Sequence, residues 1–148
     1  MTNPMTFAKF FAIVLFSALA ATDALGGQLS DNELKSGLVG SWVNPPDTEI
    51  VLPARQIFRD DGTTFVYIYK TAECREPAAA FEGRWSVVDG MLITLITRSS
   101  HPQLVAVGQI DQVAIVALDP GRMVLNADDE VYVREKSETC YPPDSHRT

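Results

Sequence analysis

Short apolar runs, most of them alternating with polar residues, fill the chain from about residue 38 to residue 134. β-branched and aromatic side chains are common in these runs, and aspartate, glycine and proline separate one run from the next. This pattern predicts β-strands, and no long helical period interrupts it. We expect strands at about residues 39–44, 55–59, 63–70, 79–88, 91–98, 110–118, 122–126 and 130–134.

The segments between these runs are mostly short turns. Asp89-Gly90 is the strongest hairpin signal, because both residues tolerate the positive φ values of a tight turn. Ahead of the first strand, Ser30 and Glu33 match the capping-box pattern and predict a single helical turn over residues 33–37. Consecutive strands joined in this way are typical of an up-and-down meander, and closure of the sheet removes its exposed edges. We therefore predict an all-β fold, an eight-stranded antiparallel up-and-down barrel, with a β-sandwich or a partly open barrel as alternatives.

Side chains alternate across a strand, so each run offers one face to the interior. In residues 79–88, Phe81 and Trp85 lie opposite Glu82 and Arg84, which belong in water. In residues 63–70 both faces are apolar, and Lys70 on one of them favours the aromatic face as the inner one. The predicted interior, and with it the candidate ligand-binding set, therefore consists of Phe65, Tyr67, Tyr69, Phe81 and Trp85. A small barrel filled by its own side chains is the equally open alternative.

The first two dozen residues have the pattern of a secretory signal peptide. Lys9 precedes an apolar run over residues 10–21, and small residues follow, with possible cleavage after Ala21 or Ala24. A dozen apolar residues are too few to span a bilayer core of about 30 Å. We expect residues 1–24 to be removed, leaving residues 25–148 as one domain that is periplasmic or secreted.

The formal net charge is −7, and loss of Lys9 and Asp23 with the signal peptide leaves it unchanged. This acidic balance argues against nucleic acid and anionic membrane surfaces as partners, since both require clustered lysine and arginine. We expect no membrane span in the mature protein.

Two cysteines, Cys74 and Cys140, lie in the exported part of the chain. In an oxidising compartment they predict one disulfide, closing a loop of 66 residues (140 − 74). Such a loop is worth about 4 kcal/mol in the chain-entropy model. Two free thiols or an intermolecular bridge remain alternatives. Two cysteines and two distant histidines give no zinc spacing, so we expect no metal site and no cofactor.

A catalytic site would need a nucleophile and a base in contact. Ser99, Ser100 and His101 are neighbours, but adjacent residues in a loop that ends at a proline rarely form the Ser–His hydrogen bond that catalysis needs. The paired aspartates Asp60-Asp61 and Asp128-Asp129 occupy turns, where aspartate is favoured for backbone reasons. We expect no catalytic residues and no enzymatic activity.

Two Gly-x-Trp motifs, Gly40-Ser41-Trp42 and Gly83-Arg84-Trp85, lie in the first and fourth runs. A glycine in a strand permits close approach of another backbone, and tryptophan fills the closed end of a barrel with one wide group. The chain resembles lipocalins, specifically the small secreted bacterial lipocalin-like (calycin-type) domains. The resemblance rests on the first motif in the first strand, the eight-strand meander and the signal-peptide pattern.

The resemblance implies roles for several residues. Trp42 would close the barrel floor, and Arg134 on the last strand would pack across it in a cation–π contact. Cys74 and Cys140 occupy the two places that many secreted lipocalins join by a disulfide. Trp85, in the middle of its strand, is then the better candidate for touching a ligand than Trp42.

Three functions remain open at this stage. The first is an exported barrel that binds a small apolar ligand in its interior. The second is a protein-binding barrel, such as an inhibitor of an extracellular enzyme, that uses residues 25–32, 45–53 or 99–103. The third is a hydrolase acting through Ser99 or Ser100, the function that the residues favour least.

Overall fold

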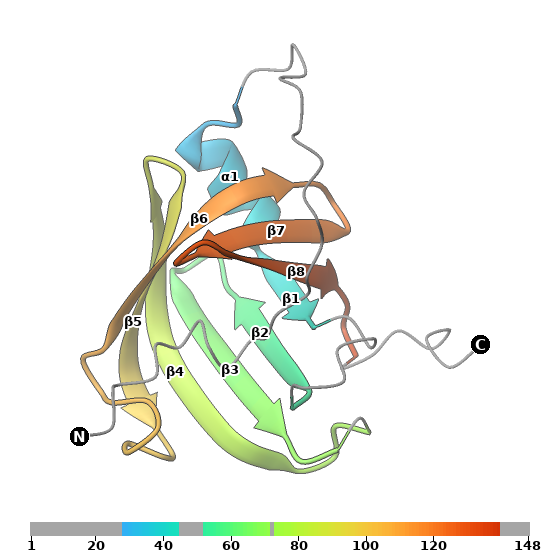
Figure 1. Ribbon diagram of the computed structural model, residues 1–148, viewed down its shortest axis with the longest axis vertical. Helices are drawn as coiled ribbons and strands as arrows, with labels where there is room; N and C mark the ends of the chain where they lie inside the picture. The colour runs from blue at the N-terminus through green and yellow to red at the C-terminus, as the bar shows by residue number, and fades with distance from the viewer. Residues whose placement is uncertain (1–27, 45–51, 72, 140–148) are drawn as a thin grey trace.

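The computed structural model describes residues 28–44, 52–71 and 73–139. One helix and eight strands follow one another along the chain (Figure 1). Their bounds are α1 Asp31–Leu38, β1 Gly40–Val43, β2 Ala54–Phe58, β3 Thr63–Tyr69, β4 Pro77–Val88, β5 Met91–Ser99, β6 Ile110–Leu118, β7 Arg122–Ala127 and β8 Glu130–Lys136. The expected signal peptide and Cys140 lie outside the described residues.

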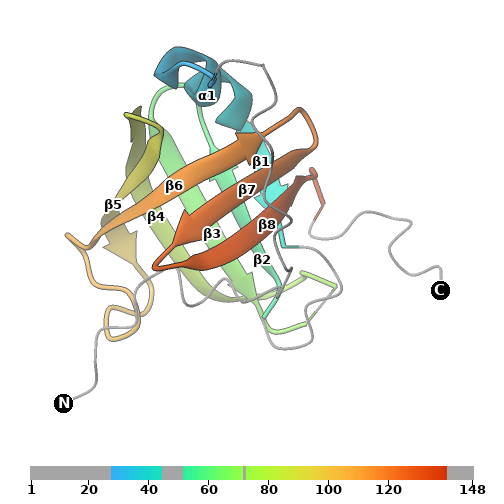
Figure 2. The same cartoon turned by 45° about the horizontal axis from the view of Figure 1, so that its top comes forward.

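Each strand pairs antiparallel with the next one along the chain, and β8 returns to β1. The closing register places Trp42 opposite Lys136 and Val43 opposite Glu135. The sheet therefore forms a closed eight-stranded barrel, seen from two directions in Figures 1 and 2. The predicted fold class is confirmed, and every predicted strand is present, with its ends within two residues of the prediction.

Helix α1 covers the end of the barrel at which β4 turns into β5 (Figure 1). The capping box is present: Ser30 N–H donates to Glu33 Oε2 at 2.8 Å, and Glu33 N–H donates to Ser30 Oγ at 3.2 Å. The helix runs further than the single turn predicted, because Leu34 and Leu38 both find apolar surface to bury. Its first turn is also attached to the barrel, since the Asp31 carboxylate accepts hydrogen bonds from the backbone of the β4–β5 turn.

The interior holds a continuous cluster of buried apolar side chains from α1, the loop before β6 and every strand except β6, whose Val113, Ile115 and Leu118 are partly buried and pack against it. Its largest members are aromatic, and each tryptophan in it has a partner for its indole N–H. Trp42 Nε1 donates to Leu38 O at 2.8 Å, and Trp85 Nε1 donates to Arg59 O at 2.9 Å. Trp85 also meets Phe58 edge to face, with ring centroids 5.1 Å apart. As predicted, Phe81 and Trp85 point inward.

The inner face of β3 differs from the prediction. Thr64, Val66 and Ile68 are buried in the interior, whereas Phe65 and Tyr67 lie on the outer face of the barrel. Alternation breaks between Ile68 and Tyr69, which are both buried, so the outward position of Lys70 fixes the face of Tyr69 but not the faces of Phe65 and Tyr67. The register against β4 shifts at the same point, with Ala78 as the extra residue on β4.

The glycines of the two Gly-x-Trp motifs permit close approaches, as expected for glycine in strands. A Cβ on Gly83 would lie 2.5 Å from the backbone oxygen of Leu95 on β5. A Cβ on Gly40 would lie 2.7 Å from Lys136 Cε, and Gly40 also has a φ of +133°. Both motifs thus serve the barrel wall.

Candidate functional site

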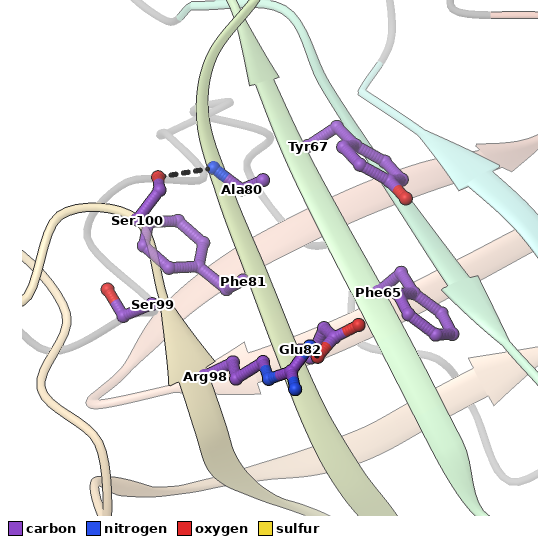
Figure 3. Close-up of a pocket in the computed structure, with 8 residues that line it drawn as sticks. All are labelled: Phe65, Tyr67, Ala80, Phe81, Glu82, Arg98, Ser99 and Ser100. Atoms are coloured by element: carbon purple, nitrogen blue, oxygen red, sulfur yellow. Dashed lines mark hydrogen bonds and ion pairs between the residues drawn. The ribbon is translucent and has the colours of Figure 1, made fainter.

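The outer face of β3, β4 and β5 carries a groove of about 290 Å³. Aromatic rings, a guanidinium, a carboxylate and two hydroxyls meet in it (Figure 3). The lining residues are Phe65, Tyr67, Ala80, Phe81, Glu82, Arg98, Ser99 and Ser100. Its size is at the lower end of the range typical of small-molecule sites, about 300–1,000 Å³.

Strand register brings these residues together. Tyr67 on β3 is paired with Ala80 on β4, and Ala80 O accepts the N–H of Ser100 at 3.0 Å. One step along the barrel, Phe65 is paired with Glu82, and Glu82 is paired with Arg98 on β5. Two adjacent rows of the sheet therefore form the groove.

A second β-bulge decides where Arg98 points. The β4–β5 register shifts between Glu82 and Gly83, so that Thr97 is the extra residue on β5. Without the bulge, Arg98, two residues after Ile96, would share the inward orientation of Ile96, which is buried. With it, Arg98 extends across β4 on the outer face, and its Nη1 lies 3.4 Å from Glu82 Oε2 (Figure 3).

More arginines surround the two exposed rings. The Arg59 guanidinium lies 4.5 Å from the centroid of the Phe65 ring, a cation–π geometry. Arg55 is paired with Tyr67 across β2 and β3 and donates to Ser41 Oγ at 2.6 Å. Arg84 follows Glu82 by two positions and therefore shares its outward face. Carboxylates offset part of this charge, since Glu138 Oε2 lies 3.9 Å from Arg55 Nη2 and Asp61 interacts electrostatically with Arg59 and Arg84.

Ser100 and His101 lie at the edge of the groove and do form the hydrogen bond that the sequence analysis considered rare. Ser100 Oγ and His101 Nδ1 are 2.7 Å apart. The expectation was wrong because two further bonds fold the loop back: Ala80 N–H donates to Ser100 Oγ at 2.9 Å, and His101 N–H donates to Ser99 Oγ at 3.2 Å. The Ser100 hydroxyl thus holds the loop against β4.

The five predicted ligand-binding residues do not form one site. Phe65, Tyr67 and Phe81 line the groove. Tyr69 lies beside Tyr67, with centroids 6.4 Å apart. Trp85 is 4% exposed and packs under α1, where the Lys35 ammonium lies 5.9 Å from its ring centroid.

The Lys136 ammonium lies over Trp42, with Nζ 5.5 Å from the ring centroid. Arg134 is buried in the interior, where its Nη1 donates to Gln56 Oε1. Gln56 Nε2 in turn donates to Thr64 Oγ1 at 3.2 Å. Burial lowers the pKa of Arg134 to about 10, so the group stays cationic at neutral pH. Sequence alternation along β8 puts Arg134 and Lys136 on the same face of the strand.

A second surface on the outside of the barrel is apolar. Leu95 and Ile110 are register partners across β5 and β6, and they are 37% and 59% exposed. We call these two residues the β5–β6 apolar face.

Two further findings concern the described part of the chain. Within it, no helix is long and apolar enough to span a membrane. No group of three or more histidine, cysteine, aspartate or glutamate side chains in residues 28–44, 52–71 and 73–139 is placed to hold a metal ion.

The sequence alone did not identify Arg98, Ser99 and Ser100 as groove residues, because the alternation of residues in β5 gives no sign of the Thr97 bulge.

Two solved structures share this fold. A lipocalin-like protein from Bacteroides uniformis gives a TM-score of 0.51 at 12% identity, over 68% of this chain and 99% of that chain. An NMR structure of a protein from Bacteroides uniformis gives a TM-score of 0.51 at 17% identity, over 70% of this chain and 92% of that chain. No protein-family model and no curated protein matches the chain. The predicted lipocalin-like barrel is thereby confirmed as a fold.

Proposed function

Because the chain has the lipocalin-like barrel fold, we propose that it is an exported protein that binds a small, mainly apolar ligand. The observation that carries the proposal is the groove over β3, β4 and β5, where the partly exposed rings of Phe65 and Tyr67 supply apolar surface. Ligand sites of this kind combine aromatic walls with a few polar groups that orient the ligand.

The proposal places the ligand in this groove instead of the barrel centre. The centre contains Trp42, Phe58, Phe81 and Trp85, all at most 4% exposed and packed in one cluster. In a close-packed interior a ligand would have to displace side chains. Phe65 and Tyr67, in contrast, are half-buried and reach solvent.

The test is a titration of residues 25–148 with the neutral apolar dye N-phenyl-1-naphthylamine, followed by its fluorescence. We expect saturable binding that Phe65→Ala and Tyr67→Ala together weaken about tenfold or more, since each removes an aromatic contact. Val133→Ala, another half-buried position, on β8, is the control. Saturable binding that survives the double variant but is lost in Trp85→Phe would place the ligand inside the barrel and refute the groove.

A protein-binding barrel is the second candidate, and the β5–β6 apolar face supports it. Exposed apolar patches on soluble proteins often mark contacts with other proteins. The test is affinity purification from the culture medium of the native host, with wild-type protein and Ile110→Glu in parallel. A protein retained by the wild type and lost by the variant would support this candidate, and identical eluates would remove it.

Export and the disulfide belong to the same proposal. Mass spectrometry of the protein from its host is expected to show cleavage after Ala21 or Ala24. Non-reducing peptide mapping is expected to show Cys74 joined to Cys140. A chain that retains residue 1, or that carries two alkylatable thiols, would contradict these expectations. The proposal includes no catalytic role for Ser99, Ser100 or His101.

A further inference from the structure

The groove has a pronounced polarity across its width. One side consists of the Phe65 and Tyr67 rings on β3. The other side consists of the Arg98 guanidinium and the Ser99 and Ser100 hydroxyls at the end of β5 (Figure 3). A ligand that contacts both sides therefore needs an apolar part and a polar part.

The charged side chains around the groove indicate whether that polar part of the ligand is anionic or cationic. Four arginines lie on or beside the outer rows that contain Phe65 and Tyr67: Arg55, Arg59, Arg84 and Arg98. Carboxylates lie near all four: Glu138 Oε2 is 3.9 Å from Arg55 Nη2, Asp61 interacts electrostatically with Arg59 and Arg84, and Glu82 is paired with Arg98. Of the four arginines, Arg98 lines the groove itself, so the charge preference of the groove rests on Arg98.

Arg98 is the guanidinium best placed to bind a ligand. Its side chain is 81% exposed, and the recorded ion pair, with Glu82 at 3.4 Å, joins it to a side chain that is 39% exposed. Ion pairs between exposed side chains contribute little, because water screens them and two long side chains must be held in place. An incoming anion can therefore replace Glu82 on Arg98 at small cost. A guanidinium can also take a carboxylate or sulfonate through two parallel hydrogen bonds.

We propose that the groove selects a small organic anion, with a flat apolar body against Phe65 and Tyr67 and a carboxylate or sulfonate on Arg98. This inference rests on the proposed ligand-binding function and specifies the class of ligand. Glu82 acts as the competing anion: it holds Arg98 across β4 when the groove is empty and is displaced when the ligand binds.

Two dyes that share one apolar body test this directly. 8-Anilinonaphthalene-1-sulfonate is the anionic form, and N-phenyl-1-naphthylamine is the neutral one. The wild-type mature chain is expected to bind the anionic dye about fivefold to tenfold more tightly, as a charge-assisted contact would give. The preference is expected to shrink as salt rises from about 0.01 M to about 0.5 M, because screening weakens exposed charge contacts.

Three variants locate the effect. Arg98→Gln is expected to abolish the preference, so that the anionic dye binds no more tightly than the neutral one. Glu82→Gln is expected to increase affinity for the anionic dye about threefold or more, since the competing carboxylate is gone. Arg122→Gln removes an exposed arginine from β7, away from the groove, and is expected to change neither dye. Adding the anionic dye is expected to change the NMR chemical shifts of the backbone amides of Phe65, Tyr67 and Ser100, which would show that the dye binds in the groove.

The outcomes separate the two proposals. Equal affinity for the two dyes, with both weakened by Phe65→Ala, would overturn the inference and leave the proposed function standing. An unchanged preference in Arg98→Gln, or amide shifts confined to interior residues, would also overturn the inference. Binding of neither dye would remove both proposals together.

Discussion

The ammonium of Lys136 lies 5.5 Å from the centroid of the Trp42 ring, and Gly40 provides the space for its side chain. Trp42 is fully buried, and its indole N–H is bonded to the end of α1. The first Gly-x-Trp motif therefore connects the helix, the first strand and the last strand at one end of the barrel.

Gly40→Ala is expected to destabilise the protein by about 1–2 kcal/mol, because a φ of +133° is strained for any residue with a Cβ. The new Cβ would also lie 2.7 Å from Lys136 Cε, so Lys136 has to move away from Trp42. Urea unfolding followed by tryptophan fluorescence measures the change. Gly121→Ala is the control, since the nearest atom to its Cβ would be 3.9 Å away. Equal midpoints for the two variants would contradict the expectation.

Gly83→Ala tests the second motif by a different mechanism. The added Cβ would lie 2.5 Å from Leu95 O, which is backbone and cannot turn aside as a lysine side chain can. We expect a loss of roughly 2–3 kcal/mol through overpacking, larger than the loss in Gly40→Ala. Thermal unfolding by circular dichroism gives the comparison. A smaller shift than that of Gly40→Ala would show that β4 and β5 can separate locally.

Asp31 attaches α1 to the barrel. Its carboxylate accepts hydrogen bonds from Asp89 N–H at 2.8 Å and Gly90 N–H at 2.9 Å. Asp31→Ala is expected to cost roughly 1–2 kcal/mol, since both amides lose a charged acceptor. Amide hydrogen exchange at Asp89 and Gly90 should accelerate, and Asp119→Ala, which removes a carboxylate from another turn, should leave both rates unchanged. Unaltered exchange in Asp31→Ala would show that water replaces the carboxylate without loss.

Glu33 makes the helix sensitive to acid. The hydrogen bond from the Ser30 backbone N–H, with the Ser30 side chain adding to it, holds the pKa of Glu33 below its ordinary value. A carboxyl whose pKa is lowered by folding stabilises the fold above its ordinary pKa, and this contribution disappears as pH falls through the lowered value. NMR titration of the Glu33 carboxyl carbon is expected to show the lowered pKa in the wild type. In Ser30→Ala the pKa should move towards its ordinary value, and a pKa unaffected by this change would assign the shift to the backbone contact alone.

An esterase assay can test whether the Ser100–His101 pair is catalytic. We expect residues 25–148 to show no Ser100-dependent esterase activity on short or medium acyl esters. The Ser100 hydroxyl already accepts a hydrogen bond from the Ala80 N–H and holds its loop in place. Ser99→Ala serves as the matched variant. Turnover by the wild type that disappears in Ser100→Ala alone would make the protein a hydrolase and contradict the expectation.

The number and order of strands could be predicted because each depends on local information. Alternation sets each strand, and turn residues such as Asp89 and Gly90, both with positive φ, set the hairpins. The Ser30–Glu33 capping box was likewise predictable from a spacing of three residues. In β4, the polar residues Glu82 and Arg84 sufficed to place Phe81 and Trp85 inside.

The site was decided by tertiary structure, through packing and strand pairing. Each face of β3 is apolar, so its sequence alone did not distinguish Val66 from Phe65 as the inner residue, and the packing of Val66 into the interior cluster decided it. The Thr97 bulge likewise turned Arg98 outward to join Phe65 and Glu82 in one groove. Alternation has a period of two, so one extra residue reverses every orientation beyond it, and the sequence does not mark where that residue falls. The sequence by itself thus determined the barrel, and the pairing of its strands determined which side chains the barrel presents to a ligand.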